Sequence, residues 1–150
     1  MWSRSIWGLS IAGAVAFWVT NLAISLTPLA ADYRDALSIP YAPMLIEAAV
    51  GGTLAGLSVS WILLRFPHRV PGRGPVTKAL LVCLLAVVVV TVLVEVPGKL
   101  LGSTDRPFHY LLVATGINVL RFSALGLSIG LLCLHAAGRV RRRTSGAGSS

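Results

Sequence analysis

The chain has 150 residues, of which 55% are hydrophobic and 12% are charged, and its formal net charge at pH 7 is +8. Water-soluble domains carry about 25% charged residues, so this composition excludes an ordinary soluble globular protein. The apolar residues are also concentrated in four long blocks. We therefore expect an integral membrane protein.

Each apolar block is long enough to cross a hydrocarbon core of about 30 Å as a helix. The four predicted spans are Ile6–Leu26, Met44–Leu64, Ala79–Val96 and Tyr110–Leu134, within helices that cover residues 6–27, 44–65, 78–97 and 108–136. Short connections make consecutive helices antiparallel neighbours. We predict an all-α integral membrane protein in which residues 1–138 form one up-down bundle of four transmembrane helices.

The first span also has to be distinguished from a signal peptide. Arg4 precedes the apolar run, and the sequence TPLAAD (27–32) would supply a cleavage site near Ala30 or Ala31. The run is longer than the ~7–15 apolar residues of a signal peptide, and the small residues before the cut are poorly placed. We expect a retained first helix.

The segments between the spans are short and contain helix-breaking residues. In the 29–43 segment, Asp32 is the candidate cap of a short interfacial turn. Pro43 suits the first turn of the second helix, where a missing N–H needs no partner. Pro97 and Gly98 are expected to end or kink the third helix.

Basic residues are divided unequally between the two sides of the predicted bundle. One side has no acidic residue. Its basic residues are Arg4, Arg65, Arg69, Arg73, Lys78, Arg139, Arg141, Arg142 and Arg143. The charges of the loops on the opposite side sum to zero. The positive-inside rule therefore predicts a multi-pass protein of the cell membrane with both termini in the cytoplasm.

Residues 139–150 form the predicted cytoplasmic tail, basic at first and then disordered. The basic run RVRRR (139–143) could bind nucleic-acid phosphates, but beside a span it is expected to fix topology instead. Its four arginines are predicted to contact anionic lipid headgroups, each contact contributing ~1 kcal/mol. These are Arg139, Arg141, Arg142 and Arg143. We expect no nucleic-acid partner.

An arginine lies in the most apolar part of the chain, in GINVLRFSALG (116–126). Near the bilayer centre, Arg121 costs roughly 2.5–3.5 kcal/mol on insertion scales, so it should face acceptors inside the bundle. Two acidic residues lie in the other spans, and Asn118 shares a helix face with Arg121. The predicted buried polar cluster consists of Asn21, Glu47, Glu95, Asn118 and Arg121.

The polar cluster has two interpretations. One is a charge-neutralised network that holds four helices in register. The other is a binding site for a proton, an ion or a small polar ligand, because ionisable groups inside a membrane often mark function. Access of solvent to the cluster distinguishes the two: a sealed cluster indicates a structural network, and an open one indicates a ligand site.

Small residues recur at four-residue spacing on two spans. They are Ala48, Gly52, Gly56 and Ser60 on the second span, and Gly126 and Gly130 on the fourth. Such stripes let helix backbones approach closely in a membrane. The sequence leaves open whether these contacts form within one chain or between chains.

The sequence predicts no catalytic, cofactor or metal site. The histidines, His68, His109 and His135, lie at different depths, which does not suit haem or zinc ligation. Cys83 and Cys133 are expected to behave as small buried hydrophobic residues.

Three functions remain. The first is a structural or accessory subunit that docks on a larger membrane complex or on copies of itself. The second is a transporter of a small solute, or a proton-coupled carrier, that uses Glu47, Glu95 and Arg121. Four helices cannot enclose a wide path, so transport would require a homo-oligomer. The third, less favoured, is an intramembrane enzyme that acts on a polar headgroup.

Overall fold

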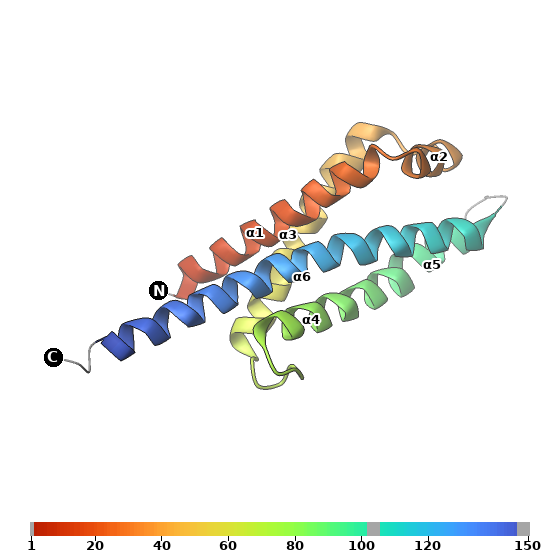
Figure 1. The fold of residues 1–150 in the computed structure, drawn as a ribbon. Helices are drawn as coiled ribbons and strands as arrows, with labels where there is room; N and C mark the ends of the chain where they lie inside the picture. The colour runs from red at the N-terminus through yellow and green to blue at the C-terminus, as the bar shows by residue number, and fades with distance from the viewer. Residues whose placement is uncertain (1, 102–105, 147–150) are drawn as a thin grey trace.

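The computed structural model describes residues 2–101 and 106–146, with side chains described between residues 6 and 138 (Figure 1). The elements in chain order are α1 (Trp2–Ser25), α2 (Pro28–Ala36), α3 (Tyr41–Arg65), α4 (Pro75–Val90), the π-helical turn η1 (Thr91–Glu95), α5 (Val96–Leu100) and α6 (Pro107–Gly146). The described residues contain no strand.

Four segments are long and apolar enough to span a membrane: Ile6–Ser25, Tyr41–Arg65, Pro75–Leu100 and Pro107–Gly138. The prediction is confirmed to this extent: the described residues are all helical or irregular, and four of the helices are long and apolar enough to cross a membrane. The helices are generally longer than expected. The fourth continues to Gly146, so the start of the expected disordered tail is helical, and residues 147–150 lie outside the described part of the chain.

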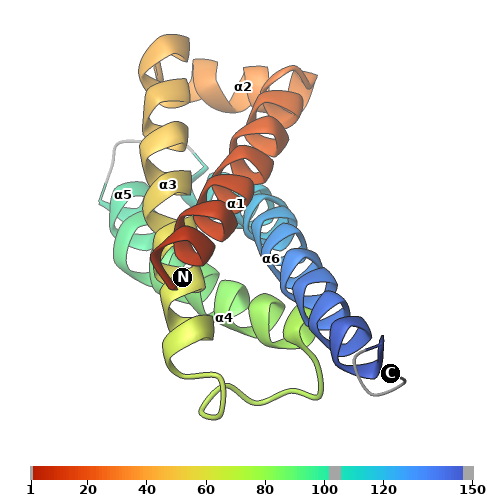
Figure 2. The same ribbon diagram turned by 90° about the vertical axis from the view of Figure 1, so that its left-hand side faces the viewer.

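The helices pack as two pairs joined through α1 and α6. α1 makes extensive contacts with α3 and with α6, and α4 makes extensive contacts with α6, whereas α3 touches α4 at only a few places. Figure 1 shows the start of α1 and the end of α6 at one end of the molecule, with α2 and α5 at the other. We call the latter the α2 end, and α2 lies there across the ends of α1 and α3 (Figure 2).

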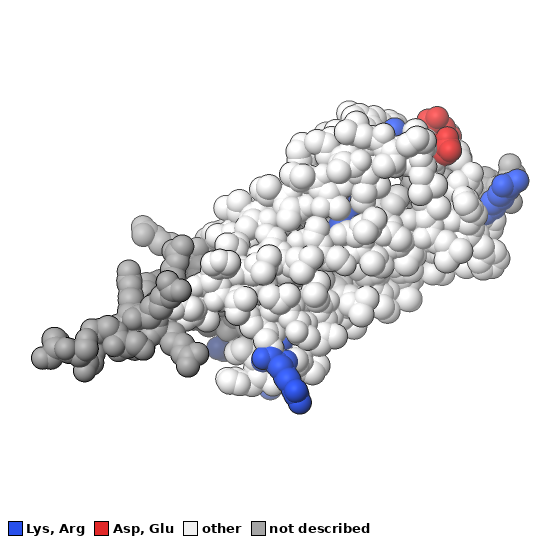
Figure 3. Space-filling model, in the orientation of Figure 1, with Lys and Arg blue, Asp and Glu red and all other residues white. Residues whose placement is uncertain are grey.

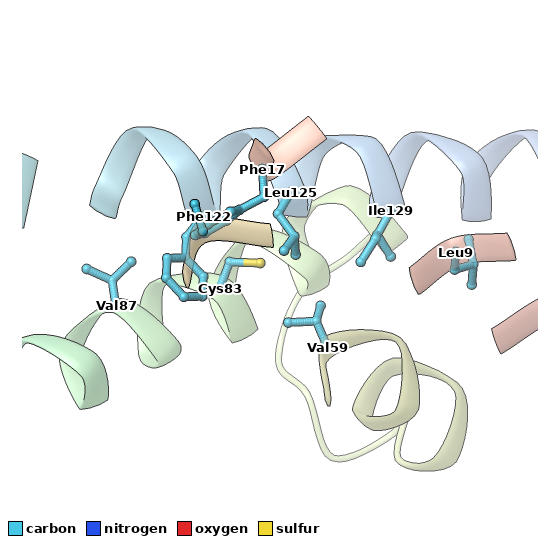
Figure 4. Packing of buried hydrophobic residues seen from close by; sticks show 9 residues of the cluster. Leu9, Phe17, Val59, Cys83, Val87, Phe122, Leu125 and Ile129 are labelled. Carbon is cyan, nitrogen blue, oxygen red and sulfur yellow. The ribbon is translucent and has the colours of Figure 1, made fainter. Parts of the chain in front are cut away.

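Close packing is concentrated near the middle of α6 and toward the loop between α3 and α4. Leu125 and Ile129 of α6 are fully buried, and Phe122 lies edge-on to Phe17 of α1 with 5.3 Å between ring centroids. The core side chains shown in Figure 4 come from all four long helices: Leu9, Phe17, Val59, Cys83, Val87, Phe122, Leu125 and Ile129. This cluster fixes how α1, α4 and α6 lie relative to one another.

Glycines set the closest approaches between helices. A Cβ atom at Gly56 of α3 would lie 2.6 Å from the backbone oxygen of Ser10 of α1. At Gly130 of α6 it would lie 2.6 Å from the Cα atom of Val76 of α4. Only a residue without a side chain permits such contacts, and membrane helices gain stability from them through van der Waals packing.

The third span continues through Pro97 instead of ending there. The proline ring has no N–H and would clash with the carbonyl four residues earlier in a regular α-helix. The π-helical turn Thr91–Glu95 widens the backbone just before it, and the Val96 N–H bonds to the Thr91 carbonyl oxygen. Of the two outcomes expected at Pro97, an end or a kink, the helix end does not occur, because the wider turn accommodates the ring and the helix runs to Leu100.

The connection between the first two spans contains the two-turn helix α2. Thr27 is its N-cap and accepts a 3.3 Å hydrogen bond from the Ala30 N–H, with Pro28 at the first helical position. Threonine at the N-cap followed by proline is a favoured helix start. Asp32 lies inside this helix, so its expected role as the cap is wrong.

Charged side chains lie at the two ends of the molecule. Figure 3 shows both acidic and basic side chains near the α2 end and basic ones near the opposite end, with a broad surface between them that carries little charge on this face. This surface includes many exposed hydrophobic side chains, such as Ile46 and Leu93. A surface of this kind suits contact with lipid.

Candidate functional site

A cavity of about 800 Å³ lies between α3 and the continuous segment α4–η1–α5. Helices α1 and α6 form its back wall, and α2 contributes residues at one end. It exists because α3 packs on α1 while α4 packs on α6, so α3 and α4 have little direct contact. All five residues of the predicted polar cluster line it: Asn21, Glu47, Glu95, Asn118 and Arg121.

Most of the cavity wall away from the α2 end is apolar. Its residues there include Val59, Ile62, Val82, Leu85 and Val89. Leu85 and Val89 are also 64% and 46% exposed, so this part of the cavity opens on the outside of the helix bundle. In a membrane, such an opening faces the lipid chains.

Glu95 is held by two neighbours. Its carboxylate accepts a 3.1 Å hydrogen bond from the Asn118 side-chain amide and lies 3.8 Å from the Lys99 ammonium group. The Glu95 and Lys99 side chains are only 18% and 13% exposed. The π-helical turn places Glu95 here, at the last residue before α5. This part of the cluster is therefore internally satisfied.

Arg121 has no such partner. Within the described residues, no carboxylate oxygen lies within 4.0 Å of its guanidinium group. Its Nε atom is buried and makes no hydrogen bond. Its guanidinium carbon lies 5.8 Å from the centroid of the Phe17 ring. A cation–π contact of this kind compensates only part of the cost of removing the charge from water.

Asn21 is likewise unsatisfied. The side chain is 1% exposed, and neither its Nδ2 nor its Oδ1 atom has a hydrogen-bond partner among the described residues. A buried amide without partners costs about 1–3 kcal/mol. Asn21 lines the same cavity as Arg121, from the neighbouring helix α1. The back wall thus offers an unpaired cation together with an amide that can both donate and accept.

Glu47 differs from the other members of the cluster. It is exposed, and it lines both the cavity and a shallow groove on the outer side of α3. The structure therefore brings Glu95 and Asn118 into direct contact, places Asn21 and Arg121 beside them on the wall, and leaves Glu47 at the rim on α3.

Two residues of α2 cover the polar end of the cavity. Arg34 donates a 2.9 Å hydrogen bond to the Ser25 carbonyl oxygen, and its guanidinium carbon lies 5.1 Å from the centroid of the Tyr41 ring. The Tyr33 ring lies 5.0 Å from the Lys99 ammonium group. Burial raises the pKa of the Tyr33 phenol above its ordinary value, and the nearby carboxylate of Glu95 adds to the rise. Tyr33 is therefore neutral at physiological pH.

Three residues of this site were not predicted from the sequence: Tyr33, Arg34 and Lys99. The spacing of Glu95 and Lys99, four residues apart, is a signal for an ion pair on one helix face. Tyr33 and Arg34 carried no comparable signal, because their positions depend on how α2 folds back over the helix ends.

The small residues on the two stripes lie at contacts within the chain. Ala48, Gly52, Gly56 and Ser60 are buried on α3, and a Cβ atom at Gly52 would lie 2.9 Å from Phe17 of α1. A Cβ atom at Gly126 of α6 would lie 2.9 Å from the Cys83 sulfur of α4. The side chains of Arg139, Arg141, Arg142 and Arg143, expected to contact lipid headgroups, lie outside the described part of the chain.

The donor groups of the cavity suit a polar or anionic ligand better than a metal. Within residues 2–101 and 106–146, no group of three His, Cys, Asp or Glu side chains lies close enough to hold a metal ion. Comparison of the chain with protein-family models, with curated proteins and with solved structures gives no match. The function must therefore be argued from the cavity.

Proposed function

We propose that the protein binds an amphipathic small molecule in the cavity between α3 and α4–η1–α5, taking it laterally from the membrane. The observation that carries this proposal is the position of the unpartnered groups of Asn21 and Arg121 on the wall of a cavity of about 800 Å³. A cavity of that size lies within the ~300–1,000 Å³ of typical small-molecule sites.

The geometry supports ligand binding better than a sealed structural network. A sealed network would pair Arg121 with a carboxylate and leave no space beside it. Instead, Glu95 is engaged by Lys99 and Asn118, and Arg121 borders open volume. The apolar part of the wall, which opens between α3 and α4, gives a lipid-soluble molecule a route of entry that avoids water.

The proposal includes a placement in the membrane. The four spans cross the cell membrane as an up-down bundle, with the start of α1 and the end of α6 in the cytoplasm, as the distribution of basic residues favours. The polar end of the cavity then lies in the outer leaflet. Moving the ligand across the membrane would additionally require an oligomer, because the cavity opens to the side of a single chain.

Native mass spectrometry of the protein, extracted gently from its own membrane, tests ligand binding. The informative variant is Gly51→Phe, because Gly51 lines the cavity and a Cβ atom there meets nothing within 4 Å. The matched control is Gly116→Phe, at a helical glycine that is equally open but does not line the cavity.

We expect a small-molecule adduct on the parent chain and on Gly116→Phe, and its weakening or loss in Gly51→Phe, whose ring is added at the cavity wall. The absence of any adduct on the parent, or equal adducts on all three proteins, contradicts the proposal. A partner protein retained in place of a small molecule would instead support the accessory-subunit hypothesis, with a helix of the partner covering the cavity.

A further inference from the structure

We infer that the ligand is a long-chain amphiphile with a singly charged anionic head group, a carboxylate or a phosphodiester, held by Arg121 and Asn21. This inference rests on the proposed function and names the class of molecule that the same cavity takes. It follows from three properties of the wall: its charge balance, its free hydrogen-bonding groups and its apolar length.

The charged side chains that line the cavity carry one net positive charge. The described charged residues that line the cavity are Arg34, Glu47, Glu95, Lys99 and Arg121, and their formal sum is +1. Lys99 and Glu95 neutralise each other across 3.8 Å. A ligand with a single negative charge would complete the balance, whereas a doubly charged one would face repulsion from the two glutamates.

Glu47 does not supply the missing charge. It lies at the exposed rim on α3, on the far side of the cavity, while Arg121 lies on the back wall on α6. Both line the cavity, and no carboxylate oxygen of Glu47 lies within 4.0 Å of the Arg121 guanidinium. An anionic head group in the cavity can therefore bind a guanidinium that no described carboxylate occupies.

The free hydrogen-bonding groups suit an anionic oxygen. A guanidinium group can donate two parallel hydrogen bonds to a carboxylate or phosphate, and these are among the stronger hydrogen bonds in proteins. The Arg121 guanidinium carbon lies 5.8 Å from the centroid of the Phe17 ring, and no carboxylate of the described residues lies within 4.0 Å of the guanidinium, so its N–H groups are available to such a ligand. The Asn21 amide N–H, buried and unpartnered on α1, can donate one more.

The apolar part of the wall suits a hydrocarbon chain. The cavity runs along α3 from Glu47 to Ile62, a rise of roughly 22 Å in a helix. The residues beyond the polar end are aliphatic, and they include Val59 and Ile62 on one side and Val82 and Leu85 on the other. A ligand with its head at Arg121 would thus extend its chain parallel to the surrounding lipid.

The test is a binding titration by native mass spectrometry in a nonionic detergent, with four single-chain probes. Hexadecanoate and lysophosphatidylglycerol carry one negative charge, on a carboxylate and a phosphodiester respectively, hexadecylphosphocholine is zwitterionic, and hexadecanol is neutral. We expect one or both anionic probes to bind at least about tenfold more tightly than hexadecanol, because a charge-assisted hydrogen bond is lost with the neutral probe. The tighter of the two identifies the head group.

Two variants locate the head group. Arg121→Gln should reduce the preference for anionic probes to less than about threefold while hexadecanol binds as before. Asn21→Leu removes an amide that has no protein partner, so the protein should fold at least as well as the parent, yet the preference should fall. The second variant keeps the test valid if the first does not fold.

The possible failures are distinguishable. If no probe binds, the proposed function is wrong. If all probes bind the parent equally, the cavity takes amphiphiles but the inference of an anionic head group is wrong. If the preference for anionic probes survives in both Arg121→Gln and Asn21→Leu, the head group lies elsewhere and the inference is also wrong.

Discussion

Two kinds of helix interface in the bundle are built differently. Where α1 meets α3 and where α6 meets α1 and α4, fully buried aliphatic side chains such as Leu125 and Ile129 fill the space, and glycines such as Gly56 and Gly130 bring backbones into contact. Between α3 and α4, the helices separate around a cavity whose wall carries unpartnered polar groups. The tightly packed region holds the helices in place, which lets the other region remain open.

The difference also concerns the cost of polar groups in a membrane. Several serines and threonines in the spans bond back to their own helix, as Thr20 does to the Ala16 carbonyl oxygen at 2.8 Å, whereas the hydroxyls of Ser60 and Thr91 are buried without a partner among the described residues. Asn21 and Arg121 also carry unpartnered buried atoms, and these two residues line the cavity. Buried polar groups that lack partners are uncommon and indicate a role beyond packing.

The largest expected effect comes from filling a close contact in the packed region. Gly56→Leu places a side chain against the backbone of α1, where even a Cβ atom would lie 2.6 Å from the Ser10 oxygen. We expect the free energy of unfolding to fall by about 3 kcal/mol. Gly116→Leu, at a glycine with open space, should leave stability unchanged or raise it by up to about 1 kcal/mol.

Denaturant or thermal unfolding in the same detergent measures both variants. If Gly56→Leu is as stable as Gly116→Leu, α1 and α3 do not approach as closely as described, and the contrast between the packed interfaces and the cavity between α3 and α4 loses its basis.

Removing a buried side chain from the packed region should lower the free energy of unfolding by less than Gly56→Leu does. Leu125→Ala removes a fully buried side chain, and we expect a loss of about 2 kcal/mol, near the lower limit for such changes because lipid solvates the unpacked helix well. Leu120→Ala, at a side chain 57% exposed, should change stability by less than about 0.5 kcal/mol. Equal losses in the two unfolding curves would contradict the assignment of the core.

The third prediction separates the open site from a sealed network. Removing one partner of a buried ion pair typically costs about 3–5 kcal/mol. Since no carboxylate of the described residues pairs with Arg121, we expect the free energy of unfolding of Arg121→Leu, measured in detergent without bound lipid, to be at least that of the parent. Glu95→Leu, which leaves Asn118 and Lys99 without their acceptor, should cost about 1–3 kcal/mol. The opposite ranking would favour the structural network.

The smallest expected effect is a change in how stability depends on pH, caused by Tyr33 of α2 at the polar end of the cavity. Burial raises the pKa of Tyr33 above its ordinary value, about 10, so the folded protein keeps this phenol neutral after the unfolded chain has lost the proton. The corresponding stability is present below the ordinary pKa and is lost as pH rises through the folded value.

Phenolate absorbance during an alkaline titration measures this shift, with Tyr33→Phe as the comparison. In Tyr33→Phe, the part of the phenolate absorbance that appears at the highest pH should be missing. The free energy of unfolding of this variant should also fall less steeply than that of the parent as the pH rises. A Tyr33 component that ionises at its ordinary pKa would show that α2 does not cover the cavity.

The spans were predictable because length and hydropathy dominate in a membrane, where backbone groups must bond within their own segment. The same argument placed Asn21, Glu95, Asn118 and Arg121 at similar depth, and the structure brings them to one cavity. Helix ends were predicted less well. Proline at position 97 did not stop the third span, because a π-helical turn accommodates the ring.

The pairing within the polar cluster could not be predicted from depth alone. The sequence favoured Arg121 as the partner of the glutamates, but Glu95 has Lys99 one turn along its own helix, and a local partner needs no particular packing of helices. The cavity itself depends on α3 packing against α1 more than against α4. Which helices pack against each other depends on the shapes of all four helices together.

The most direct measurement is an experimental structure of the protein in lipid nanodiscs, bound to an antibody fragment to aid image alignment. We predict an elongated density between α3 and α4, with one end against Arg121 and Asn21 and the remainder along Val59 and Leu85. A structure in which α3 closes against α4 and Arg121 pairs directly with Glu47 or Glu95 would contradict the account.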